Sequence, residues 1–156
     1  MIDPTFKTRN KTIIAEPKAE EYLKINNINH VRYGIDALHT DIDLRKVPPF
    51  IMNAPDFIVL GKDTNVPYFL EVKGFKGTIK IKEKDIRSYR RWDSKMGLIF
   101  FIYDTENNEY CKIFFIDLMR IIRANSDKIP IKTYPENRSK KYYDIPKELL
   151  PDFDNF

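Results

Sequence analysis

The sequence predicts an α/β protein built around a central mixed β-sheet with helices on its faces. Segments with helical and strand-like patterns alternate in the order helix, strands, helix, strand, strand, helix. The continuous apolar run LIFFIY at residues 98–103 is typical of a buried central strand. Hydrophobic residues make up 42% of the chain, which is enough to build a core around such a sheet.

The N-terminal part is predicted to form one helix followed by short strands. Residues 16–26 are expected to be helical, because Pro17 suits a first helical turn and apolar residues recur at helical spacing. Asn27 can close this helix, since asparagine tolerates the left-handed backbone found after helix ends. Strands are then expected at residues 30–35, 57–60 and 68–73.

The second half of the chain continues the alternation. Residues 82–95 have helical spacing and precede the LIFFIY strand. A strand is expected at residues 112–116, followed by a helix that Asp117 caps and that runs to about residue 125. Residues 141–145 are expected to form an edge strand, and the acidic tail PDFDNF is expected to fray.

One domain is expected for the whole chain, residues 1–156. A chain of this length fits a single compact domain, and no internal repeat or linker divides it. The core is expected at about residues 16–125. Residues 126–156, rich in proline, lysine and tyrosine, are expected to form a C-terminal extension.

Several classes of protein are excluded by composition. Cys111 is the only cysteine, so neither a disulfide framework nor a cysteine-ligated metal site can form within one chain. No apolar run approaches the roughly 20 residues that a membrane span needs, and the N-terminus lacks a signal-peptide pattern. We therefore expect no membrane association and a cytoplasmic location, in the host cell if the protein is viral. His39, in the segment HTDID, is interpreted as part of a polar loop rather than as a metal ligand.

Positive charge is concentrated in one segment. The net charge is +4, yet residues 73–95 alone hold nine Lys or Arg and three Asp or Glu. Such localised charge suits a polyanionic partner, namely nucleic acid, although a solvated surface also explains it. The candidate phosphate contacts are Lys76 and Lys80 in a predicted loop, and Lys84, Arg87 and Arg91 along one face of the predicted helix.

Two acids and one lysine stand at the ends of predicted strands. Alternate side chains of a strand share a face, so Glu71 and Lys73 project side by side from YFLEVK. Asp56 directly precedes the strand FIVL, and pairing of the two strands would bring Asp56 next to Glu71. Two carboxylates held together repel each other unless a cation separates them. Their oxygen atoms suit Mg²⁺ or Mn²⁺, and such a site supports phosphodiester hydrolysis.

These residues resemble the signature of the PD-(D/E)XK nuclease superfamily, in which Pro-Asp is followed by Glu-x-Lys. The resemblance rests on Asp56 after Pro55 and on Glu71-Val72-Lys73, and it covers about residues 16–103. The predicted order of elements follows the superfamily's restriction-endonuclease-like core. In its phage and archaeal junction-resolving members, a first-helix Glu precedes a core Leu by about seven residues, as Glu16 precedes Leu23 here.

The resemblance implies a metal-dependent endonuclease that hydrolyses DNA phosphodiester bonds. Asp56, Glu71 and the backbone carbonyl of Val72 would bind Mg²⁺ or Mn²⁺, and Lys73 would assist the attacking water. Glu16 would complete the metal site, with Glu20 as the second choice. The likeness to phage-type endonucleases and Holliday junction resolvases also implies branched DNA as a substrate and a homodimer. A catalytically inactive nucleic-acid-binding module on the same fold remains the alternative.

Overall fold

The computed structural model describes residues 4–35 and 43–156. For residues 4–13 and for Leu44 it describes the backbone alone. His39, which is predicted to lie in a polar loop, is outside the described residues.

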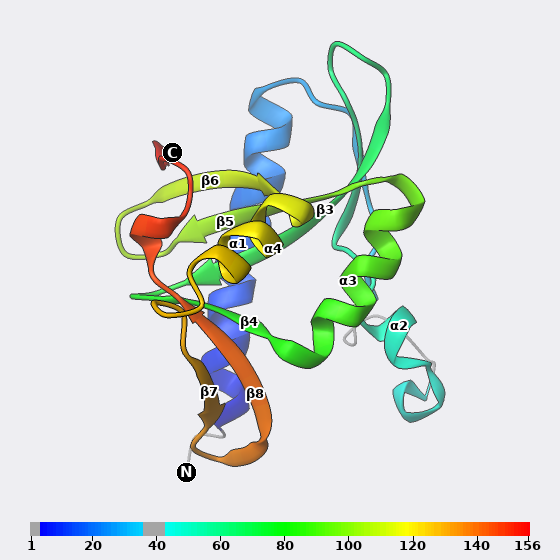
Figure 1. Cartoon of the computed structure of the whole chain (residues 1–156). Coiled ribbons are helices and arrows are strands. Elements are labelled where there is room, and N and C mark those ends of the chain that lie inside the picture. The colour runs from blue at the N-terminus through cyan, green and yellow to red at the C-terminus, as the bar shows by residue number, and fades with distance from the viewer. Residues whose placement is uncertain (1–3, 36–42) are drawn as a thin grey trace.

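A six-stranded mixed sheet forms the centre of the molecule (Figure 1). Its strands lie in the order β1-β2-β3-β5-β6-β9, where β3 and β5 are parallel and all other neighbours are antiparallel. The strands are β1 (His30–Arg32), β2 (Phe57–Leu60), β3 (Pro67–Phe75), β5 (Leu98–Asp104), β6 (Glu109–Phe114) and β9 (Asp154–Asn155). The prediction of an α/β fold around a central mixed sheet is confirmed.

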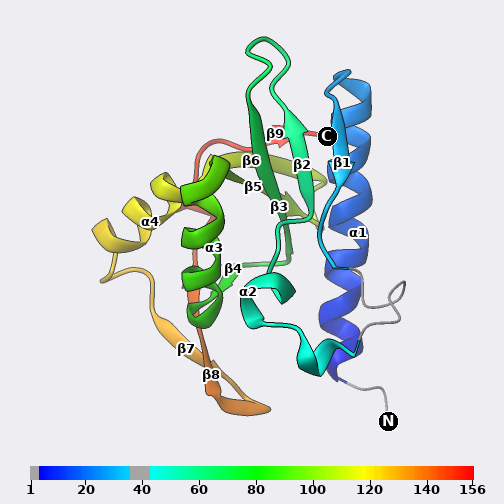
Figure 2. The ribbon, with the colours of Figure 1, turned by 90° about the vertical axis from the view of Figure 1, so that its right-hand side faces the viewer.

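Helices cover both faces of this sheet, as Figure 2 shows. The helix α1 (Pro4–Ile25) lies on one face, and α3 (Glu83–Met96) and α4 (Phe115–Ala124) lie on the other. None of the helices in the described ranges is both long and apolar enough to cross a membrane. The remaining helical segments are short: η1 (Leu44–Lys46), α2 (Pro49–Met52) and η2 (Lys147–Leu149).

The two faces of the sheet have separate apolar cores. Leu70 and Val72 of β3 pack with Leu23 of α1, whereas Phe69 of β3 packs with Trp92 of α3. This division follows from the two-residue repeat of a strand, which sends successive side chains to opposite faces. Glu71 and Lys73 therefore project towards α3, on the same face as Phe69.

The first helix begins twelve residues before the predicted start, at Pro4 rather than Glu16. Pro17 lies inside it, at a local cost of about 3 kcal/mol. Ala15, Ala19 and Leu23 are buried against the sheet on either side of Pro17, and the burial of these three side chains offsets the local cost. The predicted end is confirmed: Asn27 has φ 53°, and the N–H of Ile28 bonds to the carbonyl of Leu23 at 2.8 Å.

The predicted boundary between the last strand and helix was wrong. The strand β6 ends at Phe114, and α4 begins at Phe115. Phe115 and Leu118 are buried at helical spacing, so the core recruits both into the helix. Asp117 does not cap α4, because it lies within the first helical turn and the cap residue is Phe114.

The structure also has a second, smaller sheet that was not predicted from the sequence. It has the order β4-β8-β7, with β4 (Ile79–Lys82), β7 (Ile131–Tyr134) and β8 (Asn137–Ile145) all antiparallel. The segment predicted as an edge strand is part of β8, which is the central strand. It is central because β4 and β7, neither of which was predicted from the sequence, pair with its two edges.

The C-terminal tail is ordered rather than frayed. β9 pairs with β6, and the ring of Phe156 lies 6.1 Å from that of Tyr103 and 6.0 Å from that of Tyr110. The ammonium of Lys18 also lies 4.2 Å from the centre of the Phe156 ring. Burial of tail aromatics against the sheet therefore overrides the acidic character of PDFDNF.

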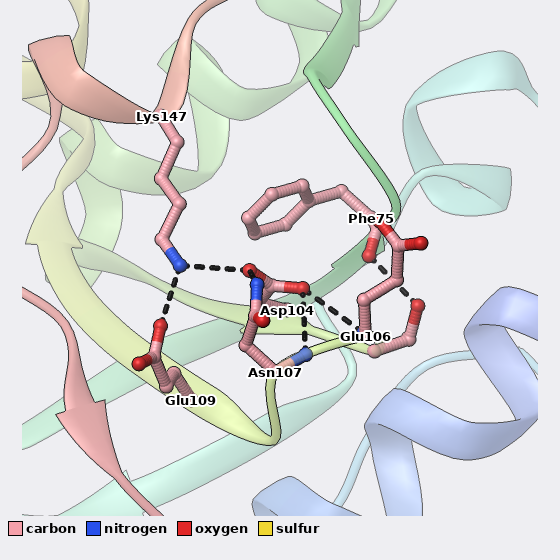
Figure 3. A network of polar contacts seen from close by, with 7 residues as sticks. Phe75, Asp104, Glu106, Asn107, Glu109 and Lys147 are labelled. Carbon is pink, nitrogen blue, oxygen red and sulfur yellow. Dashed lines mark hydrogen bonds and ion pairs between the residues drawn. The ribbon is translucent and has the colours of Figure 1, made fainter.

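A polar network joins this C-terminal region to the turn between β5 and β6 (Figure 3). Lys147 donates to Asp104 at 2.7 Å and to Glu109 at 2.5 Å, and Asn107 also donates to Asp104. Burial alone would raise the pKa of Asp104. Hydrogen bonds from Lys147, Asn107 and the N–H of Glu106 and Asn107 outweigh it and lower that pKa to about 2.

The lowered pKa of Asp104 predicts an acid-sensitive contribution to stability. The stabilisation is complete above the ordinary pKa of 3.8 and is lost as the pH falls towards 2. Asp104→Asn should therefore lower the free energy of unfolding by roughly 2 kcal/mol at pH 7. Urea denaturation at pH 7, 4 and 3 tests this, with Asp152→Asn at an exposed position as the control. An equal loss at all three pH values would contradict the assignment.

Candidate active site

The pairing of β2 with β3 brings Asp56 opposite Glu71. Phe57 pairs with Leu70, so the next step outward sets Asp56 against Glu71. Ile58 packs on the α3 side of the sheet. Asp56, two residues earlier, points to this same side, towards which Glu71 also projects. The strand register thus places the two carboxylates opposite each other, at the point where β2 begins.

The carboxylate of Asp56 takes the place of a missing strand partner. Its Oδ2 accepts a hydrogen bond from the backbone N–H of Val72 at 2.6 Å, just beyond the point where β2 begins. The carbonyl of Asp56 accepts the N–H of Tyr33 at 2.9 Å, which fixes the residue from the other side. In a strand, the N–H and C=O of one residue point to the same edge. The carbonyl of Val72 therefore also points to the Asp56 side of β3.

Glu71 is held by two donors from its own face of the sheet. Its Oε1 accepts from the ammonium of Lys73 at 2.5 Å and from the hydroxyl of Tyr89 at 3.0 Å. The Lys73 ammonium also lies 5.4 Å from the centre of the Tyr89 ring. Sequence reasoning assigned Tyr89 to the core; it is buried, and it also orients Glu71. Helical spacing identified its face but could not show its partner.

Burial and crowding of charge alter the titration of these groups. Burial, reinforced by the negative charges of Glu71 and Glu16, holds the pKa of Asp56 well above its usual value. Burial would lower the pKa of Lys73, but the charges of Glu71, Tyr89 and Asp56 raise it well above the ordinary lysine value. Lys73 therefore carries a positive charge at neutral pH, and this charge is available to stabilise an anion.

The donor atoms at this site suit a hard divalent cation. No described residue donates a hydrogen bond to Asp56 Oδ1 or Glu71 Oε2, so each carboxylate keeps one oxygen for a ligand. With the Val72 carbonyl they form an all-oxygen set of the kind that Mg²⁺ and Mn²⁺ prefer. Residues 4–35 and 43–156 contain no group of three or more His, Cys, Asp or Glu close enough to hold a metal. The fit therefore rests on two carboxylates and one carbonyl.

Glu16 and Glu20 lie on α1, and both are held by Arg32 of β1. The two guanidinium nitrogens of Arg32 lie 3.2 Å from Glu16 Oε2 and 3.1 Å from Glu20 Oε2. Glu20 is also paired with Lys24 at 3.1 Å, and hydrogen bonds from Lys24 and Arg32 lower the pKa of Glu20. Glu16, unlike Glu20, affects the titration of Asp56. The sequence showed both acids but not the arginine that bridges them.

The predicted phosphate contacts lie in different settings. Lys84, Arg87 and Arg91 are exposed on α3, on the side opposite the buried Tyr89 and Trp92, as the helical spacing predicted. Lys76 forms an ion pair with Glu106 at 3.1 Å. Lys80 lies in β4 rather than in a loop, because residues 79–82 pair with β8.

Comparison with known proteins gives a likeness in structure but none in sequence. No protein-family model and no curated protein matches the sequence. Among solved structures, this chain is similar to D212, a nuclease from a fusselovirus, with a TM-score of 0.51 and 11% sequence identity. The match covers 99% of this chain and 89% of that chain. At this identity, the likeness establishes a shared fold.

Proposed function

We propose that the chain is a nuclease of the PD-(D/E)XK type that hydrolyses DNA phosphodiester bonds with Mg²⁺ or Mn²⁺. The observation that carries the proposal is the convergence of Asp56 and Glu71 where β2 and β3 part, with the Lys73 ammonium bonded to Glu71. The fold shared with D212, which is described as a nuclease, supports it. So does the order of α1, the antiparallel strands β1 to β3, α3 and β5.

Each residue of the site has a distinct role in this proposal. Asp56, Glu71 and the Val72 carbonyl would hold the metal, which when bound polarises the scissile phosphate and activates a water molecule. Lys73 keeps its positive charge and would stabilise the negative charge that develops on the attacked phosphate. Tyr89 holds the Glu71 carboxylate in position through its hydroxyl. Lys73 would also assist the attacking water.

A more specific form of this proposal is that the substrate is branched DNA. A junction has two-fold related strands, so cutting both of them calls for two catalytic centres in one complex. The structure-specific form of the proposal therefore entails a homodimer. Cleavage assays on linear duplex, single-stranded and branched DNA, each with and without Mn²⁺, would show which of these substrates is cut.

Loss of any one of the three central side chains should abolish most cleavage. Asp56→Asn and Glu71→Gln keep the shape of the side chain but remove its charge, and Lys73→Ala removes the ammonium. Lys73→Ala should lower the rate by about 10²–10³, because it deletes one charge that stabilises the transition state. The double variants should lose little more than the single ones, since the groups act as a unit. Gel assays of cleavage, together with melting temperatures, provide the measurement.

The matched control is Lys128→Ala, an exposed lysine outside the site, which should cleave at the wild-type rate. Cleavage by the wild-type protein that persists in EDTA would falsify the metal mechanism. Tight, salt-sensitive binding of DNA without metal-dependent cleavage would instead support the inactive binding module.

Glu16 and Glu20 should differ in their effect on metal use. Glu16→Gln should raise the metal concentration needed for half-maximal cleavage. The reason is that Glu16 is the first-helix acid whose negative charge raises the pKa of Asp56. Glu20→Gln should leave that concentration near the wild-type value. It should lower stability by less than about 1 kcal/mol, because its ion pairs are partly exposed. A catalytic defect in Glu20→Gln alone would show that the wrong acid was chosen.

A further inference from the structure

The second sheet has one apolar face and one strongly basic face. Ile79 and Ile81 of β4 and Ile145 of β8 are buried in the core on the α3 side. Alternation along each strand sends their neighbours to the opposite face. That face, called the basic face below, carries Lys80, Lys82, Lys132, Tyr142 and Asp144 by the strand register. Lys140, whose charge acts on Lys82, and Tyr134, whose ring contacts Tyr142, also belong to it. It thus holds four cations and one acid.

Most of the positive charge on the basic face is not neutralised. Lys132 pairs with Asp144 at 2.5 Å, and Thr78 also donates to that carboxylate. Within the part of the chain that the structure describes, no acidic side chain forms an ion pair with the other three cations, which are Lys80, Lys82 and Lys140. A row of cations on a β-sheet is complementary to the phosphates of a nucleic acid strand.

Two tyrosines lie among these lysines. The rings of Tyr134 and Tyr142 are 4.6 Å apart at an angle of 48°. The Lys80 ammonium lies 5.0 Å from the centre of the Tyr142 ring and 5.9 Å from that of Tyr134. Tyr142 is buried, whereas Tyr134 is only half-buried. Tyr142 thus supports Tyr134, and Tyr134 is the ring that a ligand can reach.

The basic face leads to the candidate active site. β4 ends at Lys82, and the next residue begins α3, the helix that carries Tyr89; Figure 1 shows this path from β4 into α3. Burial lowers the pKa of Lys82, and the positive charges of Lys73, Lys84 and Lys140 lower it further, against the opposing effect of Asp85. Lys82 therefore lies within electrostatic reach of both Lys73 and the basic face. A phosphate beside it would relieve this crowding of positive charge.

We propose that the basic face binds a single-stranded segment of DNA and directs it to the catalytic centre. Lys80, Lys82 and Lys140 would contact phosphates, and Tyr134 would stack on an unpaired base. A duplex keeps its bases stacked inside, so it can use the lysines but not the Tyr134 ring. This inference rests on the proposed function, which supplies DNA as the ligand. It adds that the DNA bound at the basic face is single-stranded.

Binding measured in EDTA tests this without any dependence on cleavage. Fluorescence anisotropy would compare a labelled 12-nucleotide oligothymidylate, an abasic backbone of equal length and a 12-base-pair duplex. The wild-type protein should bind oligothymidylate about tenfold more tightly than the abasic backbone, because only the former offers bases for stacking. Tyr134→Ala should remove this difference, and Tyr134→Phe should retain it.

The phosphate contacts have a matched control on the same strand. Lys140 and Lys141 are adjacent, exposed and equally charged, but they lie on opposite faces of β8. Lys140→Ala should weaken binding of both single-stranded ligands and reduce the slope of log K against log salt by about 0.7. Lys141→Ala should change neither quantity. Melting temperatures confirm that each variant is folded.

Equal effects of the two lysine variants, or an unchanged preference for bases in Tyr134→Ala, would overturn the proposal. Failure of the nuclease proposal looks different. In that case the metal-dependent cleavage assay is negative, while the wild-type preference for oligothymidylate and its loss in Tyr134→Ala remain.

Discussion

The position of β3 between β2 and β5 fixes both apolar cores and the candidate site. One edge of β3 pairs antiparallel with β2, and the other pairs parallel with β5. Both of its faces are buried, by α1 on one side and by α3 on the other. Its register is therefore fixed, because a slip of one residue would send Leu70 and Val72 to the wrong core. The same register sets Glu71 against Asp56, so the packing of the core also assembles the candidate site.

β3 is longer than β2, and the difference in length creates that site. Beyond the start of β2, the edge of β3 has no strand partner, and the Asp56 carboxylate accepts a hydrogen bond from the N–H of Val72 in its place. This bond holds a carboxylate near Glu71 in spite of the repulsion between them. The ammonium of Lys73 and the hydroxyl of Tyr89 offset part of that repulsion. The site is thus an anion-rich position that the surrounding donors only partly neutralise, which is the electrostatic basis for expecting a divalent cation.

The C-terminal residues are part of the folded domain and pack against the central sheet. β8 joins β4 and β7 into a second sheet, whose apolar face closes the core on the α3 side. The Lys147 network and the pairing of β9 with β6 fasten the end of the chain to the central sheet. As a result, the cations of β4 and β8 have a fixed position relative to α3, and a basic surface lies next to the anionic site. A nuclease needs both kinds of surface, one for its metal and one for the phosphates of its substrate.

Features that depend on local repeats could be predicted from the sequence. The two-residue repeat of YFLEVK placed Glu71 and Lys73 on one face, the helical spacing of α3 separated Trp92 from the exposed Arg87, and Asn27 marked the end of α1. Tertiary structure alone decided the features that need partners from distant parts of the chain. The pairing of Lys82 with Tyr142, the bridge from Arg32 to Glu16 and the docking of Phe156 on Tyr110 leave no local pattern. The helix through Pro17 belongs with them, because only burial against the sheet offsets the local cost of a proline.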